Sequence, residues 1–357
     1  MSKKFKVMNP KPNVVMLPTV QPPLDATDER ELLELKGTLD EIVNASMVIQ
    51  NKCEDFIVKK GTTDRMLFEG NRVLSYFPEG NNLNNRSPIS DHAMGQLCNR
   101  IGVPFGYIKN CEKNDMDELV TENINQWLDA TGKDFFIREH DHRIRGVLST
   151  RYSTLDTPDI LDVLLNSTDF GTAKVKGHYL SPERFHLRLT EDTKLFNKDD
   201  LFPGIQIDSS DVGRSTLRVQ FLIYKLVCTN GMVVPTKGSV FFEQKHIGIT
   251  KDEFREGLIA ATKQFGEAQK DIIPLIKAAK NKLIDINGFN DEDYVRHISS
   301  LTHLGTDQSQ AVYELLNERY EPTMWGLANT LTEYAQSHTL ERRLEIERTA
   351  GGLLFAA

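Results

Sequence analysis

The spacing of hydrophobic and polar residues divides the chain into a helical start, a strand-rich middle and a helical end. Apolar residues recur at helical spacing in residues 28–60 and again in residues 116–130. Ser90 is a suitable cap for a helix over residues 91–100. Strand-like runs follow, with one helix expected at residues 158–165, and helical periodicity returns after Thr250. We therefore predict an α+β fold, with a strand-rich central core, helical N-terminal elements and an α-helical C-terminal part.

This order also suggests a division of the chain into three parts. Residues 1–27 hold five prolines and few large apolar residues in any periodic pattern, so we predict a mobile arm. Residues 28–250 are expected to form an α+β core domain, and residues 251–357 a helical C-terminal domain. Within the core, Thr229-Asn230-Gly231 predicts the turn of a β-hairpin between residues 221–228 and 232–234.

Arginines, lysines and aromatic residues interleave along the strand-like runs between Arg138 and Lys245. In several of these runs cationic and apolar residues alternate, and alternation sends them to opposite faces of a strand. One face would build a core, while the other would present cations and aromatic rings to a phosphate backbone with stacked bases. A solvated cationic face explains the same pattern. The candidate nucleic-acid contacts are Arg143, Arg145, Arg151, Tyr152, Lys174, Lys176, Tyr179, Arg214, Arg218 and Lys225.

The charge distribution permits a local basic groove in a protein that is acidic as a whole. The net charge is −8, yet residues 133–250 hold 16 basic and 15 acidic residues, against 27 and 36 in the rest of the chain. The four cysteines are scattered and form no C-x-x-C pair, so we expect neither a zinc knuckle nor a disulfide framework. No apolar run approaches the length of a membrane span. We expect a cytoplasmic protein that needs no cofactor and does not enter a membrane.

Four segments of the chain carry short motifs that occur together in a known family. They are Met94-Gly95-Gln96-Leu97 with Gly102-Val103-Pro104, residues 144–152, residues 227–232 and Trp325-Gly326-Leu327-Ala328-Asn329. In these segments the chain resembles a family of phage- and plasmid-associated proteins known only as a domain of unknown function, DUF932. The resemblance covers roughly residues 87–350 and implies the setting of a mobile genetic element, without implying any chemistry. A more distant likeness, in general layout, is to the single-strand annealing proteins of recombination.

Other residues suggest chemistry that we weigh against simpler roles. His140 and His142 would share one face of a strand, as two metal ligands should, but no third ligand is evident. Glu243 and Lys245, with Asp208 or Asp211 upstream, resemble the carboxylates and lysine of metal-dependent nucleases. Solvated charges at a strand end are the favoured interpretation of that motif. Cys228 has no evident partner base, so we interpret it as structural.

The leading hypothesis is a nucleic-acid-binding protein of a phage or plasmid that aids annealing or recombination of single-stranded DNA. No catalytic or metal-binding residue is assigned to it. The alternatives are a metal-dependent nuclease and a non-enzymatic protein that counters a host defence system. Apolar residues in the helical tail, including Trp325, Leu340 and Leu354, exceed what isolated helices can bury. They favour a homo-oligomer, with an intramolecular helical subdomain as the other possibility.

Overall fold

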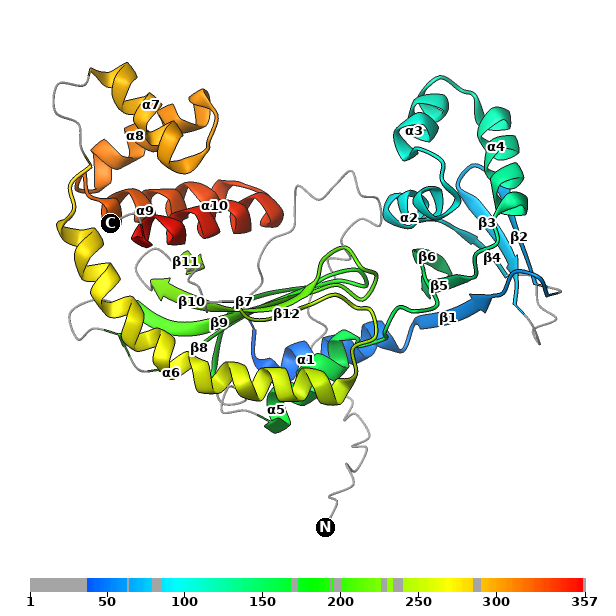
Figure 1. The fold of residues 1–357 in the computed structure, drawn as a ribbon, viewed down its shortest axis with the longest axis horizontal. Helices are drawn as coiled ribbons and strands as arrows, with labels where there is room; N and C mark the ends of the chain where they lie inside the picture. The colour runs from blue at the N-terminus through cyan, green and yellow to red at the C-terminus, as the bar shows by residue number, and fades with distance from the viewer. Residues whose placement is uncertain are drawn as a thin grey trace, which may run out of the picture.

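A computed structural model provides the three-dimensional structure of the chain. It describes residues 37–62, 64–78, 85–167, 173–192, 194–195, 201–225, 230–233, 240–284 and 290–355. The predicted arm at residues 1–27 lies outside the described residues, and so does Cys228. Two bodies are visible in Figure 1, which we call the small lobe (residues 53–148) and the large lobe (residues 39–50 and 155–355).

The small lobe contains two three-stranded antiparallel sheets and three helices. One sheet has the order β1-β5-β6 and the other β2-β3-β4. The helices and sheets enclose a separate hydrophobic core that includes Phe68, Met94 and Ile124. Ser90 caps the second helix of the chain through a bond from the Ala93 amide, as its sequence predicted. The elements are β1 (Cys53–Val58), β2 (Arg65–Gly70), β3 (Val73–Phe77), β4 (Asn85–Pro88), α2 (Asp91–Ile101), α3 (Phe105–Lys113), α4 (Asp117–Ala130), β5 (Phe135–His140) and β6 (Arg143–Leu148).

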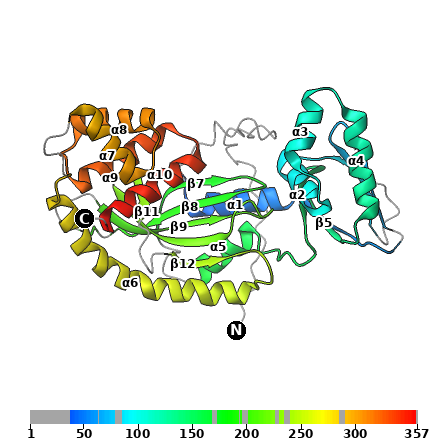
Figure 2. The ribbon, with the colours of Figure 1, turned by 45° about the horizontal axis from the view of Figure 1, so that its top comes forward.

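The large lobe is built around one antiparallel sheet of six strands. Its order is β11-β10-β9-β8-β7, and β12 pairs with β10 next to β11. The strands are β7 (Lys174–Leu180), β8 (Phe185–Thr190), β9 (Leu201–Ser209), β10 (Leu217–Lys225), β11 (Asn230–Val233) and β12 (Val240–Gln244). Three helices cover one face of this sheet, as Figures 1 and 2 show: α1 (Leu39–Gln50), α5 (Thr157–Ser167) and α6 (Lys251–Asn281).

The last helices of the chain pack on the other face of the sheet. Helix α6 begins at a capping box in which Thr250 and Glu253 exchange hydrogen bonds, and it curves around the sheet with Pro274 inside it (Figure 1). The chain then returns over the sheet, so that α9 and α10 lie opposite α6. These helices are α7 (Asp291–Thr302), α8 (Thr306–Arg319), α9 (Met324–Tyr334) and α10 (Leu340–Gly352).

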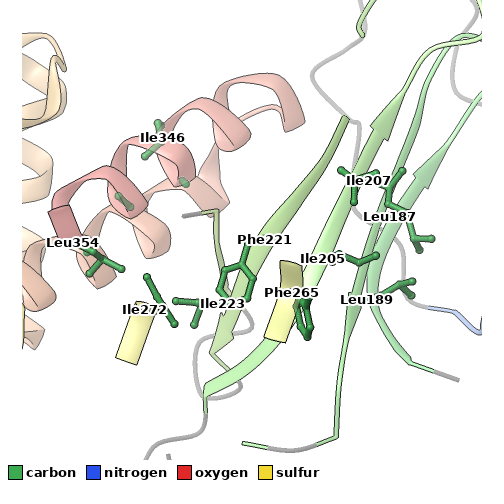
Figure 3. Close-up of a cluster of buried hydrophobic side chains, with 14 of the residues drawn as sticks. Leu187, Leu189, Ile205, Ile207, Phe221, Ile223, Phe265, Ile272, Ile346 and Leu354 are labelled. Carbon is green, nitrogen blue, oxygen red and sulfur yellow. The ribbon is translucent and has the colours of Figure 1, made fainter. Parts of the chain in front are cut away.

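The alternation of side chains along the central strands separates an apolar face from a polar one. Figure 3 shows Leu187 and Leu189 of β8 beside Ile205 and Ile207 of β9, and these side chains belong to the main hydrophobic core. The residues between them, such as Arg188, point to the other face. That face is where α10 lies, so the alternation predicted from the sequence places a polar surface beneath a helix.

The fold confirms the predicted α+β class and the helical C-terminal part, and corrects two details. Residues 53–58 form β1, so the helix expected over residues 28–60 ends at Gln50 among the described residues. Asn230 begins β11, so it lies in the second strand of the predicted hairpin and not in its turn. The main hydrophobic core joins the sheet to α6 and the later helices, and the division into domains predicted from the sequence stays a prediction.

Candidate functional site

The polar face of the six-stranded sheet carries a ladder of hydrogen-bonded side chains across neighbouring strands. On β8 and β9, Nδ1 of His186 lies 2.7 Å from Oδ1 of Asp208, and Nε of Arg188 donates to Oε1 of Gln206 over 3.2 Å. Burial raises the pKa of Asp208, but its electrostatic interaction and hydrogen bond with His186, together with the hydrogen bond from Gln206 and the charge of Arg348, outweigh this effect and lower the pKa to about 2. The Asp208 carboxylate therefore stays ionised at neutral pH.

Helix α10 is fixed to this face by a buried ion pair. Arg188 and Glu347 are both fully buried, and the guanidinium of Arg188 bonds to the carboxylate of Glu347. Nε of Arg343 donates to the same carboxylate over 2.9 Å, one helical turn away on α10. Since charges so deeply buried are stable only when paired, this network sets the position of α10 on the sheet.

Between α10 and the sheet lies a pocket of about 400 Å³, which we call the α10 pocket. Its basic side chains are Arg184, which directly precedes β8, His186 of β8, Arg218 of β10 and Arg348 of α10. Its acidic side chains are Asp208, Glu341 and Glu345. The remaining lining residues are Tyr179, Phe185, Ser209, Ser215, Thr216, Leu340 and Leu344.

The arginines of the α10 pocket already have carboxylate neighbours. Arg184 pairs with Glu341, and Arg218 pairs with Glu243 of β12. Nη2 of Arg348 lies 3.9 Å from Oδ2 of Asp208, which is a looser contact. Among the described residues, no acceptor bonds to Nε of Arg218 or Nε of Arg348. The pocket is thus nearly balanced in charge, with unused donor capacity on two guanidinium groups.

A second cluster of buried charges joins the two lobes. Arg138 of β5 is fully buried and binds Asp55 of β1 through two bonds of 2.9 and 3.0 Å. It also binds Asp156, just before α5, through bonds of 2.7 and 2.6 Å, and donates to the backbone carbonyl of Asp211. One guanidinium therefore connects strands of the small lobe with the start of a helix and a turn of the large lobe.

Asp211 is the member of this interlobe cluster with the most altered ionisation. Burial and the nearby charge of Asp156 raise the pKa of Asp211 to about 7, although Arg145 lies 3.7 Å away. Its carboxylate accepts hydrogen bonds from the amide and hydroxyl of Thr157, at 3.2 and 3.1 Å. This burial and these partners suit a structural role, because the group is fixed between packed elements.

The predicted nucleic-acid contacts do not form one surface. Tyr179 and Arg218 line the α10 pocket, and Nε of Arg214 lies close by, 2.8 Å from Glu183. Tyr179 is nevertheless 8% exposed and packs against Leu340 and Leu344, so little of its ring remains open for stacking.

The other candidates are distributed over three regions. Lys174 is exposed and pairs with Asp192, while Lys176 lies over the rings of Phe202 and Tyr224. Arg145 and Tyr152 are at the lobe interface, where Tyr152 donates to the carbonyl of Ser210 and stacks on His246. Arg143 begins β6, Arg151 is exposed, and the backbone of Lys225 pairs with β9 and β11.

Three basic residues of the pocket are not among the contacts predicted from the sequence: Arg184, His186 and Arg348. The alternation along β8 places His186 on the polar face, so its side of the sheet was predictable. Arg348 lies in the helical tail, and nothing in its local sequence indicates that α10 returns across the sheet. Tertiary packing alone brings it to the pocket.

The residues of the nuclease motif are separated by a guanidinium. Arg218 pairs in register with Asp208 on one side and with Glu243 on the other, so a cation stands between the two carboxylates. Within the described ranges, no group of three or more histidine, cysteine or acidic side chains is arranged to hold a metal ion. The strand expected to carry both His140 and His142 is corrected, because Asp141 and His142 form a hairpin turn with positive φ of 51° and 61°.

The fold and pocket define an α+β protein with a helix-covered polar sheet. Residues 145–351 match the sequence model of the family described as Domain of unknown function (DUF932), and this match covers more than half of the chain. The chain therefore belongs to the DUF932 family, as its motifs indicated. No curated protein and no solved structure matches it. In the described part of the chain, none of the helices has the length and apolar character needed to cross a bilayer.

Proposed function

We propose that this protein binds single-stranded nucleic acid and holds a phosphate-bearing segment of the strand in the α10 pocket. The observation that carries this proposal is the convergence of Arg184, His186, Arg218 and Arg348 on one pocket. Guanidinium groups match the geometry of phosphate oxygens, and they are the commonest contacts to a nucleic-acid backbone.

The size of the pocket favours a single strand over a duplex. About 400 Å³ lies within the range of sites that enclose a small ligand, roughly 300–1,000 Å³, and so suits a nucleotide-sized segment. A double helix would meet α10 on one side and the sheet on the other. The partly exposed guanidinium of Arg348 and the more exposed carboxylates of Glu341 and Glu345 place the opening along α10.

Binding would require an exchange of partners on the arginines. A phosphate that approaches Arg218 must compete with Glu243, and one that approaches Arg184 must compete with Glu341. Among the described residues, the ion pair of Arg348 is the long 3.9 Å contact to Asp208, so Arg348 offers the least hindered first contact. The Nε atoms of Arg218 and Arg348 have no acceptor among the described residues, but both atoms are buried, so a phosphate would reach them only after these side chains move.

The test is a binding titration with fluorescent single-stranded DNA, single-stranded RNA and duplex DNA at several salt concentrations. Arg218→Gln with Arg348→Gln should weaken single-strand binding by about tenfold or more, since each lost charged contact costs about 1 kcal/mol or more. The matched control is Arg296→Gln with Arg319→Gln, two exposed arginines of α7 and α8, which should bind as the wild type does. Affinity should also fall as salt rises.

Two results would count against the proposal. If the protein binds no nucleic acid at low salt, the hypothesis of a protein that counters a host defence system becomes the favoured one. If both double variants bind equally well, the strand binds outside the α10 pocket. The titration should be repeated with Mg²⁺, because cleavage that disappears in Glu243→Ala would favour the nuclease prediction.

The apolar residues of the helical tail, which favoured self-association, are buried within the chain. Leu327, Leu340, Leu353 and Leu354 are buried within the chain itself, against the sheet and the neighbouring helices. This burial supports the intramolecular alternative for the helical tail, and light scattering at micromolar concentration would measure the state directly.

A further inference from the structure

The small lobe displays a row of exposed apolar side chains along α3 and α4, which we call the α3–α4 stripe. It consists of Tyr107, Met116, Leu119 and Trp127, which are 42%, 49%, 42% and 50% exposed. Leu119 and Trp127 are eight residues apart on α4 and so lie on one face of the helix. Asn123 lies between them and donates to the hydroxyl of Tyr107 over 3.2 Å, which joins the two helices into one surface.

The opposite side of α4 already holds the helix in the lobe. Val120, Ile124 and Leu128 are buried in the small-lobe core. Asn125 exchanges two 2.8 Å hydrogen bonds with the backbone of Phe68, and so closes the outer edge of β2. The main anchoring of α4 therefore comes from this opposite side, and the four half-exposed side chains of the stripe offer roughly 300–400 Å² of surface for another group.

The charge around the stripe indicates what kind of group fits it. Residues 105–130 carry six acidic and two basic side chains, including Glu118 and Glu122 on the first turns of α4. A second copy of the stripe would bring like charges together, which opposes association. The complementary occupant is a segment in which lysine or arginine residues stand among apolar ones.

A segment of this composition exists in the same chain. Residues 1–12 carry four lysines and no acidic residue, and Phe5, Val7 and Met8 stand among them. The described part of the chain begins at Gly37, and the 24 residues between can span up to about 80 Å. A globular chain of this length has a radius of gyration of roughly 20 Å, so the stripe is within reach.

We propose that residues 1–12 occupy the α3–α4 stripe of their own chain. The lysines would face the acidic residues of α4, and Phe5, Val7 and Met8 would cover Leu119 and Trp127. This proposal is independent of nucleic-acid binding, because the stripe and the α10 pocket share no residue and lie in different lobes.

Trp127 reports directly on this contact, because the chain has two tryptophans and Trp325→Phe leaves Trp127 as the single tryptophan, which can be excited at wavelengths that tyrosine does not absorb. In that background, acrylamide is a suitable quencher because it carries no charge. Reversing Lys3, Lys4, Lys6 and Lys11 to glutamate should increase quenching of Trp127 about twofold, since an uncovered ring regains its contact with solvent. The emission maximum should shift to longer wavelength.

A matched control carries the same number of charge reversals at Lys277, Lys282, Arg296 and Arg319, all outside the small lobe. In this control, acrylamide should quench the fluorescence of Trp127 to the same extent as in the parent. Addition of a peptide with the sequence of residues 1–12 to the lysine-reversed variant should restore the protection.

Three outcomes would overturn the proposal. The first is equal quenching of Trp127 in the parent and in the lysine-reversed variant. The second is an increase in quenching in the control variant that equals the increase in the lysine-reversed variant. The third is a loss of protection when the parent is diluted. The last result would identify a second copy of the chain as the occupant.

Discussion

Neutralising Glu347 should destabilise the large lobe, because this carboxylate is the charged partner of a fully buried arginine. Glu347 on α10 and Arg188 on β8 are both fully buried, and Arg343 bonds to the same carboxylate. Glu347→Gln keeps the shape and one acceptor oxygen but removes the charge. Arg188 would then remain in an interior from which water is excluded.

The expected loss follows from that burial. Breaking a buried ion pair by removing one partner costs about 3–5 kcal/mol, and the retained amide oxygen of Glu347→Gln favours the lower end. The large lobe holds about 200 residues, for which each kcal/mol corresponds to roughly 2–4 °C in melting temperature. We therefore expect the melting temperature to fall by about 6–12 °C. The urea midpoint of unfolding should also fall, with little change in the slope of the unfolding free energy against urea concentration.

The double variant Arg188→Met with Glu347→Leu distinguishes a lost ion pair from a packing defect. Because it removes both buried charges, it should recover most of the stability that Glu347→Gln loses, to within about 1–2 kcal/mol of the wild type. Arg343 also loses its partner, which explains an incomplete recovery. A loss below about 1 kcal/mol in Glu347→Gln, or a double variant as unstable as the sum of both changes, would refute the reasoning.

Two further predictions concern the pH dependence of stability and the packing of the sheet. The pKa of Asp211 is raised in the folded state to about 7, so its contribution to stability is complete at low pH and is lost as pH rises through 7. Between pH 5 and pH 8 the stability of Asp211→Asn should therefore rise by on the order of 2 kcal/mol relative to that of the wild type. A difference in the free energy of urea unfolding between the two proteins that stays constant with pH would contradict this. Gly204→Ala should destabilise the protein by about 3 kcal/mol or more, because a Cβ there would lie 2.0 Å from a backbone carbonyl oxygen of β8. Gly106→Ala on α3 is the control: its Cβ would meet nothing within 4 Å, and it should stabilise the protein by about 0.5–1 kcal/mol. Similar melting temperatures for the two variants would disprove the packing argument.

The elements of the large lobe were predictable because their sequence patterns are local. Alternation along β8 and β10 determines which side chains enter the core, and the periodicity after Thr250 defines α6 from its first residue, Lys251. The strand β1 was missed because residues 53–58 are too few to distinguish a strand from the end of a helix. Its pairing with β5, residue by residue from Cys53 with His140, decides the outcome, and that partner is more than 80 residues away.

The candidate site was only half predictable, for a related reason. Alternation in the sequence separates Arg188 and Arg218 from the apolar residues of their own strands, but the sequence contains no information on whether the two arginines share a surface or on what covers that surface. The structure places α10 there, and the carboxylate of Glu347 then converts an expected surface arginine into a buried one. Arg145 is also buried, at the lobe interface, where it is 3% exposed.

The ion pairs of the pocket arginines also affect the salt dependence expected for nucleic-acid binding. An unpaired guanidinium that meets a phosphate releases one condensed counterion, so each such contact adds to the salt dependence. Arg184 and Arg218 would instead release Glu341 and Glu243, and these carboxylates would collect cations of their own. The salt dependence should therefore be shallower than three free arginines would give. Specificity for a strand would come mainly from the shape of the α10 pocket, because α10 and the sheet limit what can reach the phosphate-binding groups.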